Sequence, residues 1–154
     1  MKLLERLLRS DAPASVAIVR VLVGAVFLSE GVQKFLFPAE LRVGRFTKIG
    51  IPRPELLAPF VGVVEIVAGV LVIVGLAPRL AAIALIVDML VAIATTKLPI
   101  LAKKGFFAMA HEARTDWSML LGSLFLLVEG AGPLSIDARL LRSSTSASEP
   151  KNPS

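Results

Sequence analysis

The sequence predicts an all-α integral membrane protein, built as a four-helix transmembrane bundle. Of its 154 residues, 55% are hydrophobic, and the mean hydropathy is +0.77, whereas soluble domains are about 45–50% apolar with glycine counted. The hydrophobic residues gather in four long segments, and about 20 such residues cross a hydrocarbon core ~30 Å thick. Proline and most charged residues lie between these segments. Together these observations predict a chain with little mass outside the bilayer.

Residues 1–15 are expected to form an amphipathic N-terminal segment on the membrane surface. Leucines recur at helical spacing in its first turns, opposite lysine, arginine and glutamate, a pattern typical of interfacial helices. The segment is too polar for the apolar region of a signal peptide. The first span is therefore expected to stay attached as an anchor.

A transmembrane domain is expected over residues 16–140, with spans at about 16–37, 56–76, 80–98 and 115–132. Pro78 and Arg79 leave almost no loop between the second and third spans, so these helices should be antiparallel neighbours. Trp117 fits the aromatic preference for an interface at the start of the fourth. The serine- and proline-rich stretch 141–154 is expected to be a disordered tail.

Four spans would place both termini on one side of a cell inner membrane. Counts of lysine and arginine near the spans do not discriminate between the sides. The basic flank of the first span favours cytoplasmic termini, because the first helix usually dominates orientation. The segments 41–50 and 100–111 mix basic with apolar residues and are expected to rest at the opposite interface.

The composition excludes several kinds of site. The chain has no cysteine and one histidine, His111, so disulfides, thiolate metal sites, iron–sulfur clusters, a cysteine nucleophile and a two-histidine haem site within one copy are excluded. We expect no metal site and no covalently bound cofactor. The net charge of +5 lies in short loops and near the ends; we therefore expect contact with lipid headgroups and no nucleic acid partner.

Ionisable residues inside the spans are the informative feature. A charge at the bilayer centre costs about 2.5–3.5 kcal/mol on insertion scales, so such residues usually face the bundle interior. Helical spacing places each on a face with small residues, which let helices approach closely. The candidates for ligand or proton handling are Arg20, Glu30, Lys34, Glu65, Asp88 and Asp116.

Their expected partners differ. Glu30 and Lys34 are four residues apart, in the order that favours an intrahelical ion pair. Glu65 and Asp88 should lie near the midplane with no basic residue at their depth. One of these two is then expected to be protonated, or to meet a cation or a donor from a ligand or partner. Alternatively, the acids only join helices through hydrogen bonds to Thr95, Ser123 or backbone carbonyls.

Four motifs resemble the DoxX family of small bacterial membrane proteins over about residues 16–140. They are Arg20–Gly24 followed by Glu30–Lys34, the turn Gly50–Pro52, the glycines around Glu65 up to Gly75, and Gly130–Asp137. The resemblance implies four transmembrane helices. It also implies membrane redox chemistry, because the namesake subunits belong to a thiosulfate:quinone oxidoreductase and other relatives to sulfur-stress or oxidant-detoxifying complexes. Arg20, Glu30, Lys34 and Glu65 match the recurring charged positions.

Three functions stay open from the sequence. The first is a membrane subunit of a quinone-linked redox or sulfur/oxidative-stress complex, at most one subunit of a membrane oxidoreductase, with a bound quinone or a redox partner subunit carrying the electrons. The second is a small transporter handling protons or cations, since the buried charge is mainly negative. The third is a non-catalytic membrane scaffold or assembly factor. The expected partners are the lipid bilayer and either a redox enzyme partner subunit or further copies of this chain in a homo-oligomer.

Overall fold

The computed structural model describes residues 10–147, and these contain helices and turns but no strand. The elements follow in chain order: α2 (Val16–Leu36), η1 (Pro38–Arg42), α3 (Val43–Lys48), α4 (Pro54–Val74), α5 (Pro78–Ala92), η2 (Ile93–Lys97), α6 (Leu98–Lys104), α7 (Phe106–Glu112), α8 (Arg114–Glu129) and α9 (Ile136–Ala147). The all-α prediction is confirmed. Of the expected surface helix over 1–15, residues 1–9 lie outside the described part.

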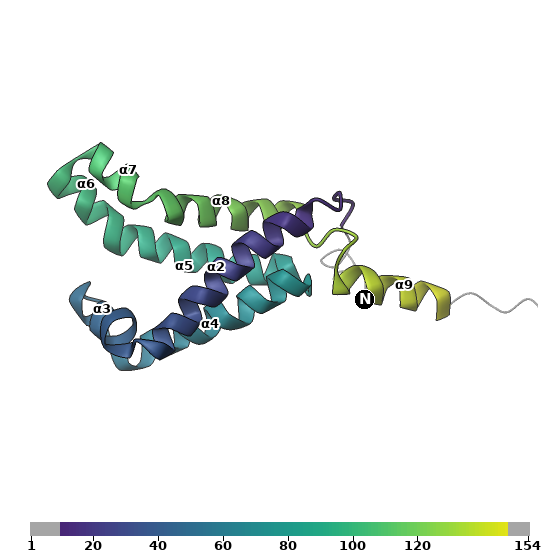
Figure 1. Cartoon of the computed structure of the whole chain (residues 1–154), viewed down its shortest axis with the longest axis horizontal. Coiled ribbons are helices and arrows are strands. Elements are labelled where there is room, and N and C mark those ends of the chain that lie inside the picture. The colour runs from purple at the N-terminus through teal and green to yellow at the C-terminus, as the bar shows by residue number, and fades with distance from the viewer. Residues whose placement is uncertain (1–9, 148–154) are drawn as a thin grey trace, which may run out of the picture.

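The long helices form two antiparallel pairs, α2 with α4 and α5 with α8. The pairs meet at one end of the bundle, near Ser10 and the start of α9, and diverge toward the other, where α3 lies across from α6 and α7 (Figure 1). We call these the terminal end and the loop end. The turn between α4 and α5 confirms that the second and third hydrophobic segments are antiparallel neighbours.

The apolar core fills the terminal half of the bundle. Each of the four long helices contributes a side chain that is essentially inaccessible, among them Val23, Val72, Leu85 and Leu126. Ser10 connects the segment before α2 to the end of α8, since its hydroxyl donates to the Glu129 carbonyl at 2.6 Å and accepts from the Gly132 amide at 3.1 Å. The core therefore closes the terminal half and leaves the loop half to the polar residues.

Glycines allow the close contact between α2 and α4. A Cβ added to Gly69 would lie 2.8 Å from the Gly24 carbonyl oxygen, and one on Gly31 would lie 2.8 Å from the Gly62 carbonyl oxygen. Backbone thus meets backbone at two levels, in a glycine seam of Gly24, Gly31, Gly62 and Gly69. This confirms that small residues beside Glu65 let α4 pack closely on a neighbour.

The substitution Gly69→Ala is expected to lower the free energy of unfolding by about 1–3 kcal/mol, because overpacking an interface displaces backbone rather than a flexible side chain. The measurement is denaturant unfolding in mild detergent. Val70→Ala is the control, since Val70 follows on the same helix and is 42% exposed. Equal stability of Gly69→Ala and the unchanged protein would contradict the glycine seam.

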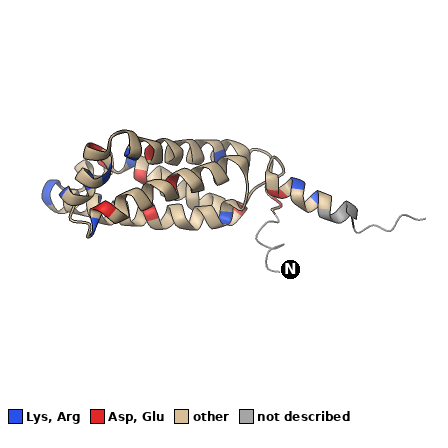
Figure 2. Cartoon of the chain, turned by 90° about the horizontal axis from the view of Figure 1, so that it is seen from below, with Lys and Arg blue, Asp and Glu red and all other residues tan. Residues whose placement is uncertain are grey.

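Within residues 10–147, three helices are long and apolar enough to cross a membrane: Val16–Leu36, Pro54–Val74 and Pro78–Lys104. Helix α8 has 16 residues, about 24 Å at 1.5 Å per residue, which is short of the ~30 Å hydrocarbon core. The membrane-spanning class is confirmed, and the fourth span stays a prediction. The outer faces carry large exposed apolar side chains such as Ile18 and Phe60, while charged residues gather at the loop end (Figure 2).

The third helix is longer than the predicted 80–98. It continues as a single run to Lys104 because the π-helical turn η2 precedes Pro99, and proline is tolerated in the first turn of the following helix α6. The segments expected at the interface, 41–50 and 100–111, form short helices at the loop end. Phe107 is 87% exposed at the tip between α6 and α7.

The chain remains helical beyond the predicted start of the disordered tail at residue 141. Helix α9 extends to Ala147, and residues 148–154 lie outside the described part. Residues 141–147 of the expected tail are therefore helical, and the disorder of the tail stays a prediction. Asp137 in the first turn complements the helix dipole, and the leucines and arginines that follow are good helix formers.

Candidate functional site

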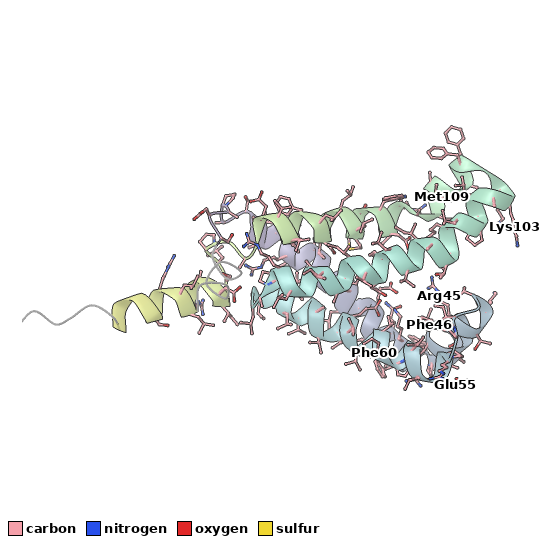
Figure 3. The ribbon with its side chains drawn as sticks, turned by 180° about the vertical axis from the view of Figure 1, so that it is seen from behind. Arg45, Phe46, Glu55, Phe60, Lys103 and Met109 are labelled. Atoms are coloured by element: carbon pink, nitrogen blue, oxygen red, sulfur yellow. The ribbon has the colours of Figure 1, made fainter. Side chains whose placement is uncertain are left out.

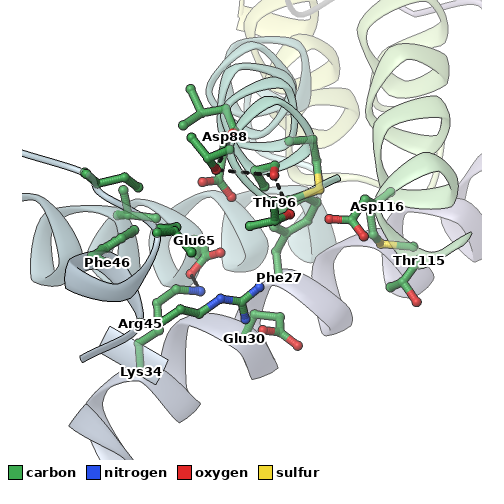
Figure 4. A pocket seen from close by; sticks show the side chains of 18 of the residues that line it. Phe27, Glu30, Lys34, Arg45, Phe46, Glu65, Asp88, Thr96, Thr115 and Asp116 are labelled. Carbon is green, nitrogen blue, oxygen red and sulfur yellow. Dashed lines mark hydrogen bonds and ion pairs between the residues drawn. The ribbon is translucent and has the colours of Figure 1, made fainter. Parts of the chain in front are cut away.

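A cavity of about 520 Å³ lies between the two helix pairs in the loop half of the bundle. Its apolar walls include Phe27 of α2, Phe60 of α4 and Met89 of α5, and α3 contributes Phe46. Polar side chains line it from seven elements, several of them labelled in Figure 4: Glu30, Lys34, Arg45, Glu65, Asp88, Thr96, Lys97, Glu112, Thr115 and Asp116. An apolar chamber with a few converging polar groups is the usual form of a small-molecule site.

Lys34 and Glu65 form an ion pair across the α2–α4 interface, with Lys34 Nζ 2.6 Å from Glu65 Oε2. Both side chains are buried, at 12% and 4% exposure. The expectation that Glu65 has no basic partner was therefore wrong. It compared backbone depths, whereas helical side chains lean toward the N-terminus of their own helix. In antiparallel helices this brings Lys34 and Glu65 toward each other.

Asp88 of α5 completes the group from the second helix pair. The carboxyl groups of Asp88 and Glu65 lie close enough to interact, and two neighbouring carboxyl groups in an apolar setting favour the state in which they share one proton. Asp88 Oδ2 is buried and has no hydrogen-bond partner within residues 10–147. We call Lys34, Glu65 and Asp88 the acidic triad. It joins the two helix pairs and leaves one acceptor open toward the cavity.

The hydroxyl groups of Thr95 and Ser123 were the alternative hydrogen-bond partners for the buried acids, and the structure does not place them in that role. Thr95 donates to the carbonyls of Val91 and Ala92 in its own helix. Ser123 is fully buried, and its hydroxyl has no partner among the described residues. Neither hydroxyl bonds Glu65 or Asp88 among the described residues, and Lys34 is the ion-pair partner of Glu65.

A second ion pair crosses the α5–α8 pair on the opposite wall of the cavity. Lys97 Nζ lies 3.1 Å from Asp116 Oδ2, with side-chain exposures of 11% and 17%. Lys97 belongs to the π-helical turn η2, and such turns often occur at functional positions. Asp116 was among the candidates from the sequence and Lys97 was not, because a π-turn has no clear sequence signal.

The remaining predicted residues are separated from the triad. Glu30 lines the mouth of the cavity and is exposed. The expected intrahelical pair with Lys34 is replaced by the contact of Lys34 with Glu65, because the close helix approach makes the buried carboxylate the better partner. Arg20 lies at the terminal end, away from the cavity. The structure thus brings together Lys34, Glu65 and Asp88, with Asp116 across the cavity.

Arg20 holds the terminal end together. Its guanidinium donates to the carbonyls of Val72 at 3.1 Å, Ile73 at 2.8 Å and Ala131 at 2.5 Å, and the residue is 3% exposed. The first two carbonyls end α4, so the cation also complements the helix dipole. Arg20 therefore joins α2 to the last turn of α4 and to the segment after α8.

Asp137 secures the turn between α4 and α5 from the other side. Both of its carboxylate oxygens accept from the Ala77 amide, at 3.1 and 3.0 Å. Ala77 has φ of +46°, a left-handed conformation that is unfavourable for alanine. The terminal motif Gly130–Asp137 and Arg20 thus serve one structural unit, which we call the terminal clamp.

Asp137 should make stability depend on pH. Burial raises the pKa of its carboxyl above 3.8, opposed by the Ala77 amide and by Arg20. A raised acid pKa means that the folded state binds the Asp137 proton more tightly than the unfolded state does. The contribution of this proton to the free energy of unfolding is fully present below the pKa of the unfolded state, and it is lost as pH rises through the pKa of the folded state. Relative to Asp137→Asn, the unchanged protein should therefore lose unfolding free energy as pH rises from about 4 to 7. Paired denaturation curves measure this, and a constant difference would contradict it.

Some residues of the cavity had no clear signal in the sequence. Arg45 and Phe46 of α3, labelled in Figure 3, lie between α3 and the arm formed by α5 and α6. Thr96 and Glu112 also line the cavity. Arg45 and Phe46 come from a segment expected at the interface, and the structure places them at the cavity wall.

Long apolar helices, a core at one end and a polar chamber at the other define a multi-pass helical membrane protein with a ligand-sized intramembrane cavity. The model of the family described as DoxX matches residues 15–98, which include α2, α4, α5 and the acidic triad. The chain belongs to the DoxX family.

Relatives with curated descriptions agree with this assignment. The chain is 52% identical to the uncharacterized membrane protein Rv3486 of Mycobacterium tuberculosis over 146 residues, which is 91% of this chain and 90% of the relative. It is 32% identical to the "Putative oxidoreductase CatD" of Bacillus subtilis over 120 residues, 78% and 82% of the two chains. An uncharacterized protein of Haemophilus influenzae is 33% identical over 132 residues, 84% and 93%. No solved structure matches the chain.

Proposed function

We propose that this protein is a quinone-binding membrane subunit of a redox or sulfur/oxidative-stress complex. The observation that carries the proposal is the acidic triad at the wall of a 520 Å³ cavity. Ligand sites in proteins commonly measure about 300–1,000 Å³ and combine apolar walls with a few polar groups. The name of the CatD relative, an oxidoreductase, supports the same class of chemistry.

The residues present suit a quinone headgroup. The ring would lie against Phe27, Met89 and neighbouring apolar side chains. Lys34 is a hydrogen-bond donor for a carbonyl oxygen, and the Glu65–Asp88 pair would hold a proton for the headgroup beside the buried Asp88 Oδ2. When bound, the quinone supplies two-electron redox chemistry and takes up or releases two protons.

The chain's own residues would bind the headgroup, exclude water and exchange protons. A carboxyl pair that shares one proton can pass it to an oxygen and regain another. Glu30, Glu112 and Asp116 at the mouth provide a polar route toward solvent. With no cysteine and a single histidine in the sequence, we assign the electron transfer itself to a partner subunit that carries its own redox group.

A cation or proton transporter is the second candidate. Five acids, Glu30, Glu65, Asp88, Glu112 and Asp116, face the cavity against the three bases Lys34, Arg45 and Lys97. The terminal half disfavours this function, because Val23, Val72, Leu85 and Leu126 close it with side chains that are fully buried.

We further propose that the protein lies in the cell inner membrane with cytoplasmic termini, following the basic N-terminal flank.

Quinone titration of the purified protein tests the proposal. Binding of a substituted benzoquinone is followed by the fluorescence of Trp117, which adjoins the cavity residues Thr115 and Asp116. The double variant Glu65→Gln/Asp88→Asn should weaken binding by about tenfold or more, the effect of one lost charge-assisted hydrogen bond. Glu129→Gln is the matched control, since Glu129 ends α8 at the terminal end.

Three outcomes separate the candidate functions. Saturable binding that weakens only in the double variant supports the quinone site. Absence of binding together with proton or cation flux in vesicles would support the transporter. If the unchanged protein shows neither, and the double variant only loses stability, the triad serves a scaffold.

A further inference from the structure

The lining of the cavity includes two groups of residues of different chemistry. Helices α2, α7 and α8 contribute polar residues: Glu30, Glu112, Thr115 and Asp116. Helices α4 and α5 contribute apolar residues: Leu57, Phe60, Val61 and Val91. An opening at the polar group would suit water and protons, and an opening at the apolar group would suit hydrocarbon.

The apolar group reaches the outer surface of the bundle. Phe60 and Val91 line the cavity and are nevertheless 62% and 48% exposed, so the same side chains face both the chamber and the outside. They lie within the membrane-spanning helices Pro54–Val74 and Pro78–Lys104. The outside at this point is therefore lipid, and the route through it runs sideways into the bilayer. We call Leu57, Phe60, Val61 and Val91 the portal.

The portal arises from how the two helices are joined. Helices α4 and α5 are fixed together at their terminal ends by the turn that Asp137 holds, and they diverge toward the loop end (Figure 1). Glu65 of α4 and Asp88 of α5 line the same cavity as the portal residues.

We propose that the natural ligand is a quinone with a long hydrocarbon tail, which enters from the bilayer through the portal. The headgroup reaches the acidic triad, while the tail lies between Phe60 and Val91 and extends into lipid. This inference rests on the proposed quinone site and adds the substrate class and the route of entry. A tail costs nothing to leave in the bilayer, whereas an opening at the polar group could not accommodate it.

Steric obstruction of the portal tests the route. Two probes share one benzoquinone headgroup, and only one of them carries a decyl tail. The substitution Val91→Trp should weaken binding of the decyl probe by about tenfold or more, equivalent to about 1.4 kcal/mol, with little effect on the tailless probe. Comparison of each variant with the unchanged protein cancels the partition of the tailed probe into detergent.

Val87→Trp is the matched control. Val87 lies one turn away on the same helix, is 56% exposed, and does not line the cavity. It should leave both probes unaffected. A weakened decyl probe in Val87→Trp as well would assign the effect to the added indole on the surface rather than to the portal, and would overturn the inference.

Crosslinking provides a readout that needs no substitution. A quinone with a photoreactive group in its tail should label peptides that contain Phe60 or Val91. Labelling at Glu112 or Thr115 would overturn the portal while the quinone site stands. If neither the tailless nor the decyl probe binds the unchanged protein, the proposed function itself fails, and this outcome is distinct from a misplaced tail.

Discussion

Replacement of Arg20 by methionine is expected to lower the free energy of unfolding by about 3–5 kcal/mol, which is the usual cost of removing one partner from a buried charged network. Three carbonyl oxygens lose their donor, and Asp137 loses its nearby cation. Methionine matches the length and apolar stem of arginine, so lost packing contributes little. Denaturant titration in mild detergent gives the value.

Arg20→Lys separates charge from geometry. An ammonium group keeps the charge but cannot span carbonyls on α4 and after α8 as the guanidinium fork does. We expect a loss of about 1.5–3 kcal/mol, the contribution of one charge-assisted hydrogen bond. Arg139→Lys, on the exposed face of α9, is the control. If Arg20→Lys were as stable as the unchanged protein, charge alone would hold the terminal clamp.

The position of Arg20 shows where sequence reasoning reached its limit. Its charge inside a span correctly indicated a buried role, because an unpaired cation in hydrocarbon is costly. The sequence could not tell that its partners are backbone carbonyls, since every residue carries one. The terminal motif Gly130–Asp137 was recognised as a motif, but its contact with the left-handed Ala77 depends on a turn some 60 residues earlier.

Helix faces were predictable because hydropathy and helical spacing are local properties. The face of α4 with Ala58, Gly62, Glu65 and Gly69 is buried as expected. The cavity was not predictable, because it follows from the divergence of two helix pairs. Arg45 lines it from a segment expected at the interface, and Lys97 lines it from the end of the predicted third span.

The ion pair between Lys34 and Glu65 yields the other large effect. Lys34→Met should destabilise the protein by about 3–5 kcal/mol, because it leaves a buried acid without its cation. Glu65→Gln should cost less, since an amide needs no counter-charge, although it leaves the Lys34 ammonium in an apolar setting. Both values come from denaturant unfolding at neutral pH.

The double variant Lys34→Met/Glu65→Gln decides what the pair is for. It removes both charges together, so it should recover part of the loss, and a coupling of about 1–3 kcal/mol is expected for residues in direct contact. Additive losses would contradict the ion pair. If stability recovers while quinone binding stays lost, the pair serves the cavity rather than the fold, since buried charge pairs often contribute little net stability over apolar replacements. If the double variant recovers both stability and quinone binding, Asp88 is the group of the acidic triad that the quinone headgroup requires.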